Sequence, residues 1–214
     1  ESEIASARVS TGEYSSRPQP LSALQGETSE LPYLGGELFH GPAFQVLKSL
    51  IRTSEGASSV IDASSGVPIG RLNPALLDAA THGIPHDHLQ LWNEAMEPSK
   101  VAYPALITEM SFFGATPTSG MVRCEVRPDG FLGSNDFPAF SVQLITDDGV
   151  WCCFRLIESC FPKGSIGSAE PADRMTFLRD RRFVPGLSLS NVEDGATVLH
   201  DSTVQNVDWM PGTV

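Results

Sequence analysis

One carboxylate and one imidazole stand four residues apart in the most helix-like part of the sequence. Asp78 and His82 would project from the same face of a helix, close enough to share a hydrogen bond or a substrate. Apolar residues surround Asp78, and partial desolvation is expected to raise the pKa of its carboxyl toward the range useful for a general acid. The pair is a candidate for proton transfer, and the alternative is an Asp and a His that decorate the exposed face of the helix.

The start of that helix is well marked. Asn73 can accept a hydrogen bond from an exposed amide as N-cap, and Pro74 fits the first helical position because its missing N–H costs nothing there. We expect the helix to run from Pro74 to about His82, where Gly83 ends it. A second short helix is predicted over residues 86–96.

The rest of the fold is predicted to be β-sheet. Two apolar segments, 46–52 and 57–63, flank a turn-like Ser-Glu-Gly and would pair as a hairpin, although periodicity alone leaves the first open to a helical interpretation. Four later segments are predicted to form sequential antiparallel strands: 105–113, 120–126, 137–146 and 150–160. Asp-Asp-Gly at 147–149 predicts a hairpin between the last two, because Gly tolerates positive φ. The sequence therefore predicts an α+β fold with one helix lying on an antiparallel sheet.

Two stretches resemble signatures of the dehydratase domains of polyketide and polyunsaturated fatty-acid synthases. Residues 72–82 are similar to the family's Pro-Ala-Leu-Leu-Asp run, which carries Gln or His four residues after its Asp. Residues 37–44 match the second half of a Gly-Tyr-x-Tyr-Gly-Pro-x-Phe signature at Gly41, Pro42 and Phe44. Glu37 replaces the first Gly of that signature, and Leu38 and His40 replace its two Tyr. The resemblance covers residues 31–161 and is with the carboxyl-terminal half of the domain.

This resemblance implies a hot-dog fold, an antiparallel sheet wrapped around a central helix, as one half of a double hot dog. It also implies syn elimination of water from a β-hydroxyacyl thioester carried on the phosphopantetheine of an acyl carrier protein, with no other cofactor. Carried over, Asp78 is the general acid and His82 orients the carboxyl or the β-hydroxyl. The substrate-binding residues implied beside the acyl tunnel are His40, Gly41, Pro42 and Phe44.

One departure from the family concerns the catalytic base. In the family this base is a His of the first hot-dog half, in a His-x-x-x-Gly-x-x-x-x-Pro motif, and none of the five His here is followed by Gly at the fourth position. The chain is therefore expected to supply the acid and not the base. The alternatives are a dehydratase completed by another half, a catalytically inactive dehydratase-like domain with an acyl-binding or structural role, and an aldol-cyclising product-template domain.

The expected organisation has three parts: a linker or arm over residues 1–30, the hot-dog domain over 31–161, and an extended carboxyl-terminal linker over 162–214. Residues 1–30 are rich in Ser, Glu, Gly and Pro and can bury little. The expected partners are an acyl carrier protein and neighbouring synthase domains. A lone hot-dog half would leave an apolar edge to cover, so we also expect a homodimer or pairing with a first half.

Composition excludes several other classes. The formal net charge of −12 argues against a nucleic-acid partner, and no apolar run approaches the roughly 20 residues needed to cross a bilayer. We therefore expect a cytoplasmic protein. We expect no metal site, because His86 and His88 lack further spaced ligands, and the four Cys lack paired C-x-x-C spacing.

Overall fold

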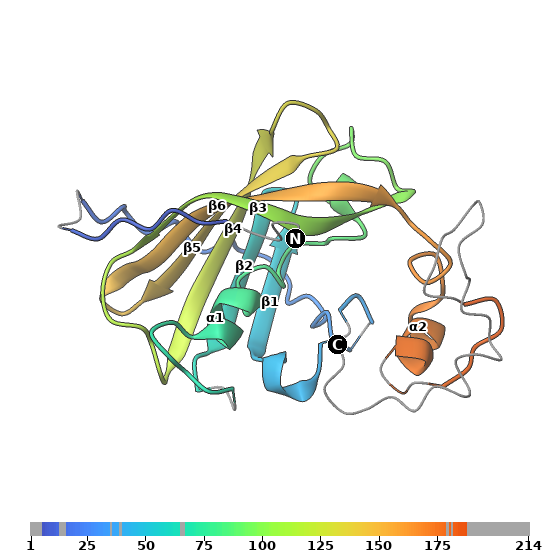
Figure 1. The fold of residues 1–214 in the computed structure, drawn as a ribbon, viewed down its shortest axis with the longest axis horizontal. Coiled ribbons are helices and arrows are strands. Elements are labelled where there is room, and N and C mark those ends of the chain that lie inside the picture. Colours follow the sequence, from blue (N-terminus) through green and yellow to red (C-terminus); the bar gives the residue numbers. More distant parts are fainter. Residues whose placement is uncertain are drawn as a thin grey trace.

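The computed structural model describes residues 6–12, 16–34, 36–38, 40–64, 67–178, 180 and 182–187. These residues form one six-stranded antiparallel sheet and a few short helices (Figure 1). The strands are β1 (Leu47–Thr53), β2 (Gly56–Asp62), β3 (Lys100–Phe112), β4 (Met121–Phe131), β5 (Pro138–Thr146) and β6 (Gly149–Pro162). The α-helices are α1 (Pro74–Ala79) and α2 (Pro171–Leu178), and the 3-10 turns are η1 (Pro42–Phe44) and η2 (Leu89–Leu91).

The sheet order is β1-β2-β4-β5-β6-β3, which confirms the two predicted hairpins. Gly149 begins β6 with a φ of 105°, the positive value that its turn was expected to need. The prediction that all four later strands pair in sequence is wrong for β3, which pairs with β6 and not with β4. Both edges of β4 are already paired, one with β2 and the other with β5, whereas β6 has a free edge opposite β5 for the long strand β3.

Helix α1 begins where the sequence predicts. The Asn73 side chain accepts a hydrogen bond of 3.2 Å from the backbone amide of Leu76, and Pro74 occupies the first turn. The helix ends at Ala79 and not near His82, because the next turn tightens: the His82 amide donates to the Ala79 carbonyl at 3.1 Å. Similarly, the helix predicted over 86–96 is reduced to the single turn η2.

The buried core lies between α1 and one face of the sheet (Figure 1). Ala75, Leu76 and Ala79 form the buried side of α1. The chain turns away after α1 where it meets the sheet, since a Cβ on Gly83 would lie 3.0 Å from the Ala57 side chain of β2. Close packing against β2 therefore fixes the position of the residues that follow α1.

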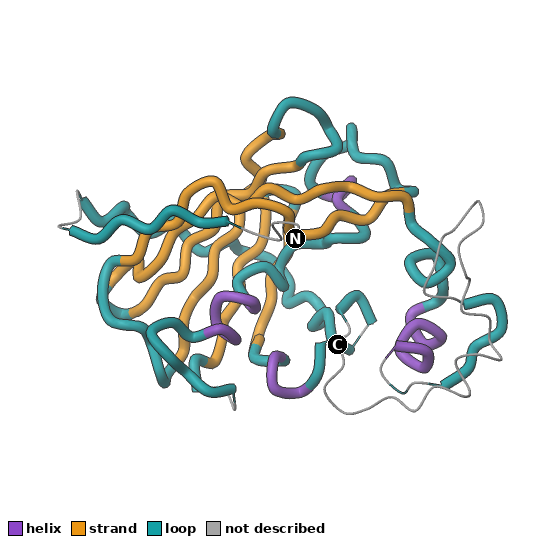
Figure 2. Tube along the Cα trace, in the orientation of Figure 1, coloured by secondary structure: helices purple, strands orange, loops and turns teal. Residues whose placement is uncertain are grey.

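The amino-terminal arm runs along the sheet without a helix or strand in its described residues, 6–12 and 16–30 (Figure 2). Its backbone amides donate to side chains of the sheet: Leu21 to Gln143 at 2.8 Å and Leu24 to Ser58 at 2.7 Å. Further along, the Ser29 amide donates to the Leu50 carbonyl of β1 at 2.8 Å. The arm is thereby attached to three strands, β5, β2 and β1.

The chain beyond β6 differs from the extended segment predicted there. Helix α2 follows, and Phe177, Val184 and Leu187 form a separate small apolar cluster. Arg174 of α2 donates to the Gly36 carbonyl at 3.3 Å, so α2 contacts the loop that precedes η1. The rest of the predicted linker, 188–214, lies outside the described residues. In the described part of the chain, no helix has the length and apolar character that a membrane span requires.

Candidate active site

Asp78 and His82 meet as the sequence predicts, although α1 ends between them. The Nε2 atom of His82 lies 3.0 Å from the Oδ2 atom of Asp78. The other ring nitrogen of His82, Nδ1, lies 2.8 Å from the hydroxyl of Tyr33. His82 is buried, whereas 37% of the Asp78 side chain is exposed. His82 therefore acts as a buried support, and Asp78 is the member of the pair that can reach a ligand.

A second imidazole approaches the same carboxylate from the loop before η1. The Nε2 atom of His40 lies 3.5 Å from Asp78 Oδ2, and the His40 and His82 rings lie with their centroids 4.3 Å apart. The Gln45 side chain donates to the His40 carbonyl at 2.7 Å, which fixes the loop. Sequence reasoning placed His40 at the substrate but did not place it against Asp78.

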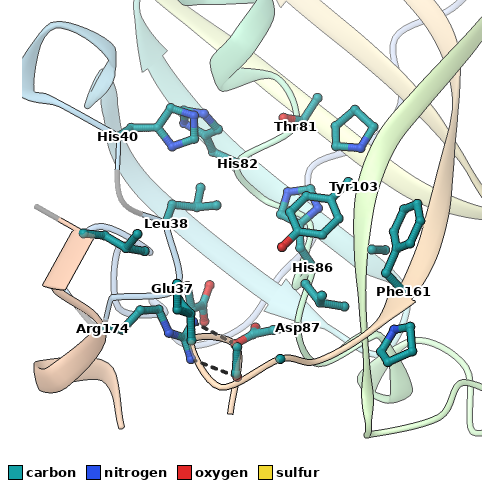
Figure 3. A pocket seen from close by; sticks show the side chains of 18 of the residues that line it. Glu37, Leu38, His40, Thr81, His82, His86, Asp87, Tyr103, Phe161 and Arg174 are labelled. Atoms are coloured by element: carbon teal, nitrogen blue, oxygen red, sulfur yellow. Dashed lines mark hydrogen bonds and ion pairs between the residues drawn. The ribbon is translucent and has the colours of Figure 1, made fainter. Parts of the chain in front are cut away.

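A pocket of about 460 Å³ opens beside these three side chains. Figure 3 shows the two imidazoles on one side of it and the rings of Tyr103 and Phe161 on the other. The apolar wall comes from the ends of β3 and β6 and comprises Val101, Ala102, Tyr103, Pro104, Phe161 and Pro162. The pocket thus combines a polar corner with an apolar wall.

Of the four residues expected to bind substrate, only His40 is among the described residues that line this pocket. Gly41 and Pro42 are exposed, and Phe44 packs against the hydrophobic core. Pro42 and Phe44 belong to η1, the turn beside α1 that follows His40. These three residues follow His40 in the chain and are absent from the described lining of the pocket.

The acidity of Asp78 differs from the sequence expectation. Burial raises the pKa of the Asp78 carboxyl, as expected, but the hydrogen bond from His82 and the nearby His82, His40 and His86 outweigh burial and lower it below its ordinary value. Asp78 is therefore ionised at neutral pH. Since an ionised carboxylate only accepts hydrogen bonds, His82 donates through Nε2, and its Nδ1 accepts from the Tyr33 hydroxyl.

The surroundings of His40 favour the neutral form of its imidazole. Burial and the neighbouring His82 lower the pKa of the His40 imidazole below its ordinary value, and Asp78 only partly offsets them. His40 is therefore neutral at pH 7, and one of its ring nitrogens carries a lone pair.

His86 lines the pocket and pairs with a buried carboxylate behind it, Glu158, a pair that sequence reasoning missed. Glu158 of β6 is fully buried, and its Oε1 atom lies 2.9 Å from the Nδ1 atom of His86. Burial lowers the pKa of His86, but Glu158 more than reverses this, with help from the Thr81 carbonyl, so the pKa is raised. The available signal was a carboxylate in the mainly apolar run of β6.

A bidentate ion pair joins the loop of His40 to the turn after α1. Arg52 of β1 donates to both carboxylate oxygens of Glu37 at 2.8 and 2.7 Å, and its Nε donates to the Gly83 carbonyl at 2.9 Å. Glu37 stands where the family signature has Gly. Glu37 therefore supplies a negative charge where the family has none, and its ion pair with Arg52 links the loop of His40 to the turn after α1.

The polar corner has a donor set that can also hold a metal ion. Ligand atoms of His40, Asp78 and His82 all lie within 4.8 Å of one another, and two imidazoles with one carboxylate suit several divalent transition metals. His86 and His88 do not converge, because His86 pairs with Glu158 and His88 pairs with Asp87 at 2.8 Å.

Solved structures of dehydratase domains share the arrangement of these strands and helices. A variant of the GphF dehydratase superposes with a TM-score of 0.50 at 18% identity, over 67% of this chain and 53% of that one. The dehydratase domain of the CurH module of the curacin polyketide synthase gives 0.50 at 16% identity, over 68% and 55%. This chain has the fold of half a dehydratase domain.

The dehydratase-like chain spans about half the length of the domains it matches, which fits one unit of a double hot dog. The CurJ-module dehydratase domain of the same synthase gives a TM-score of 0.50 at 12% identity, over 64% of this chain and 50% of that one. No protein-family model matches the sequence, and no curated protein matches it either. The likeness is therefore one of fold.

Proposed function

We propose that this chain dehydrates a β-hydroxyacyl thioester, with Asp78 as the group that delivers a proton to the departing hydroxyl. The observation that carries the proposal is the position of the Asp78 carboxylate. It contacts the buried His82 side chain at 3.0 Å and also lines the pocket. The position supplies what elimination needs, a carboxyl held beside the substrate by a buried partner.

The shape of the pocket supports an acyl substrate. Aromatic and proline side chains of β3 and β6 form the wall opposite the polar corner, and the Tyr103 and Phe161 rings lie with their centroids 6.1 Å apart. Such a wall favours an apolar chain over a polar metabolite. We further propose that the chain is presented on the phosphopantetheine of an acyl carrier protein, in the context of a multidomain synthase. The fold it shares with synthase dehydratase domains supports this.

Turnover tests the proposal. The purified chain is incubated with 3R- and 3S-hydroxyacyl thioesters of pantetheine and of a carrier protein, and loss of water is followed by mass spectrometry. We expect dehydration of one epimer, reduced at least 100-fold in Asp78→Asn. Asp147→Asn, in the exposed turn between β5 and β6, is the matched control and should retain full activity.

The contrary result is also informative. If the folded wild-type chain releases no water from any of these thioesters, the dehydratase assignment fails for this chain. Binding of the same thioesters, measured by the protection of β3 and β6 amides from hydrogen exchange, would then favour the inactive, acyl-binding alternative.

A further inference from the structure

We infer that His40 is the catalytic base, so that this one chain carries both proton-transfer groups of the elimination; the inference rests on the proposed function. The family resemblance assigns the base to the first half of a double hot dog and gives His40 only a place at the substrate. The structure instead places His40 Nε2 at 3.5 Å from Asp78 Oδ2, on the wall of the same pocket.

The spacing of the two groups suits a syn elimination. In that reaction the α hydrogen and the β-hydroxyl leave from neighbouring carbons on the same face of the substrate. The base and the proton donor must therefore lie side by side, each within hydrogen-bonding distance of the same part of the pocket. His40 and Asp78 satisfy this condition. The Nδ1 atom of His40 is buried, so Nε2 is the atom that can reach a ligand, and it acts as a base in the tautomer that carries the hydrogen on Nδ1.

His40 is also held in place, as a catalytic base needs to be. Its carbonyl accepts from Gln45, its ring lies against the His82 ring, and the Glu37–Arg52 ion pair ties its loop to the turn after α1. Two of these contacts hold the backbone and loop of His40, and the third meets its imidazole. Such pre-organisation is what lowers the entropic cost of a proton transfer.

The other described histidines suit the role of base less well. Both ring nitrogens of His82 are occupied, one by Asp78 and the other by Tyr33. His86 is paired with buried Glu158, which favours its protonated form and removes the lone pair. His88 pairs with Asp87 and is absent from the described lining of this pocket. His40 lines the pocket, and 30% of its side chain is exposed.

The positions of the two groups, 3.5 Å apart on the pocket wall, give the order of events. Nε2 of His40 removes the α proton, and the electrons of that C–H bond form the Cα=Cβ double bond while the Cβ–O bond breaks. The proton passes from His40 through the ionised Asp78 to the departing oxygen, and water leaves. Asp78 thus delivers a proton that it receives from His40, and both residues return to their starting states. No other reactant is consumed.

Two assays on the same variants test this inference separately from the proposed function. The first is dehydration. The second is exchange of the α hydrogens of butyryl-pantetheine with D₂O, which needs a base but no departing hydroxyl. His40→Gln should lose at least 100-fold in both assays, whereas Asp78→Asn should lose dehydration and retain exchange within about tenfold. His88→Gln, which changes an exposed His outside the pocket, should retain both.

The outcomes distinguish the two claims. Dehydration by wild type that His40→Gln leaves unchanged overturns the assignment of the base and leaves the proposed function standing. Exchange that depends on His40, without any dehydration, supports the base and overturns the proposed function. Neither reaction by the folded wild-type chain overturns both. Circular dichroism confirms folding, and imidazole added to His40→Ala should restore part of the exchange if the variant lacks only its base.

Discussion

The hydroxyl of Tyr33 lies 2.8 Å from His82 Nδ1, on the side of the ring away from Asp78. Tyr33 is itself buried, and burial raises its pKa to about 12, so it stays a neutral hydrogen-bond donor across the physiological pH range. Tyr33, His82 and Asp78 are therefore linked in series from the core to the pocket, by the hydrogen bond at Nδ1 and by the 3.0 Å contact between His82 Nε2 and Asp78 Oδ2. The orientation of the carboxylate depends on a residue that does not itself line the pocket.

Tyr33→Phe should weaken catalysis without abolishing it. Loss of the Tyr33 hydroxyl leaves His82 Nδ1 unsatisfied in a buried site and loosens the orientation of Asp78. We expect kcat to fall about tenfold, with KM changed less than twofold.

His82→Gln supplies the control for this effect. A Gln amide can donate to Asp78 without needing the Tyr33 hydroxyl, so Tyr33→Phe should have little further effect in the His82→Gln background. Additive effects of the two substitutions in this double-mutant cycle would contradict the hydrogen-bond chain.

The pH dependence of kcat/KM should report His40. Because the base must be neutral, activity is lost as pH falls through its pKa, and that pKa is lowered below the ordinary value of 6.5. We expect kcat/KM for the preferred thioester to be nearly constant from pH 8 to 6.5 and to decline only below it. An acid limb centred above pH 6.5 would contradict the described environment of His40.

Much of the local structure follows from the sequence, and the longer-range contacts do not. The cap at Asn73 and the turn at Gly149 depend on neighbouring residues, so both were predicted. The partner of β3 depends on a strand far along the chain. The contact between His40 and Asp78 also needs the β1–β2 hairpin to bring two motifs together, and the family signature directed attention to a Tyr at that position. Charge coupling lowered a pKa that burial alone was expected to raise.

The pair of His86 and Glu158 should make stability depend on pH. The pKa of His86 is raised in the folded protein, so its contribution to stability is fully present below the unfolded value of about 6.5 and is lost as pH rises through the folded value. The difference in free energy of unfolding between wild type and His86→Gln should therefore be largest near pH 6 and shrink toward pH 9.

Urea denaturation of Glu158→Gln provides a second measurement of the same pair. Removal of the carboxylate leaves His86 buried without its counter-charge, which should cost about 3 kcal/mol at pH 6. Equal stabilities for wild type and both variants across this pH range would show that the pair carries no charge.

Chelators should leave turnover unchanged if the polar corner acts by proton transfer. Dialysis against EDTA or 1,10-phenanthroline is expected to have no effect on the rate. Added Zn²⁺ should inhibit, because His40, Asp78 and His82 can bind it and the lone pair of His40 is then occupied. Activity that disappears with the chelator and returns with a metal would contradict the acid–base account.

The most direct measurement is mass-spectrometric turnover of a β-hydroxyacyl carrier-protein thioester by the wild-type chain alone, beside Asp78→Asn and His40→Gln. The account predicts loss of water by wild type and a decrease of at least 100-fold in each variant, because the Asp78 carboxylate and the His40 imidazole share one proton path. Turnover that survives both substitutions, or a folded wild-type chain that releases no water, would contradict it.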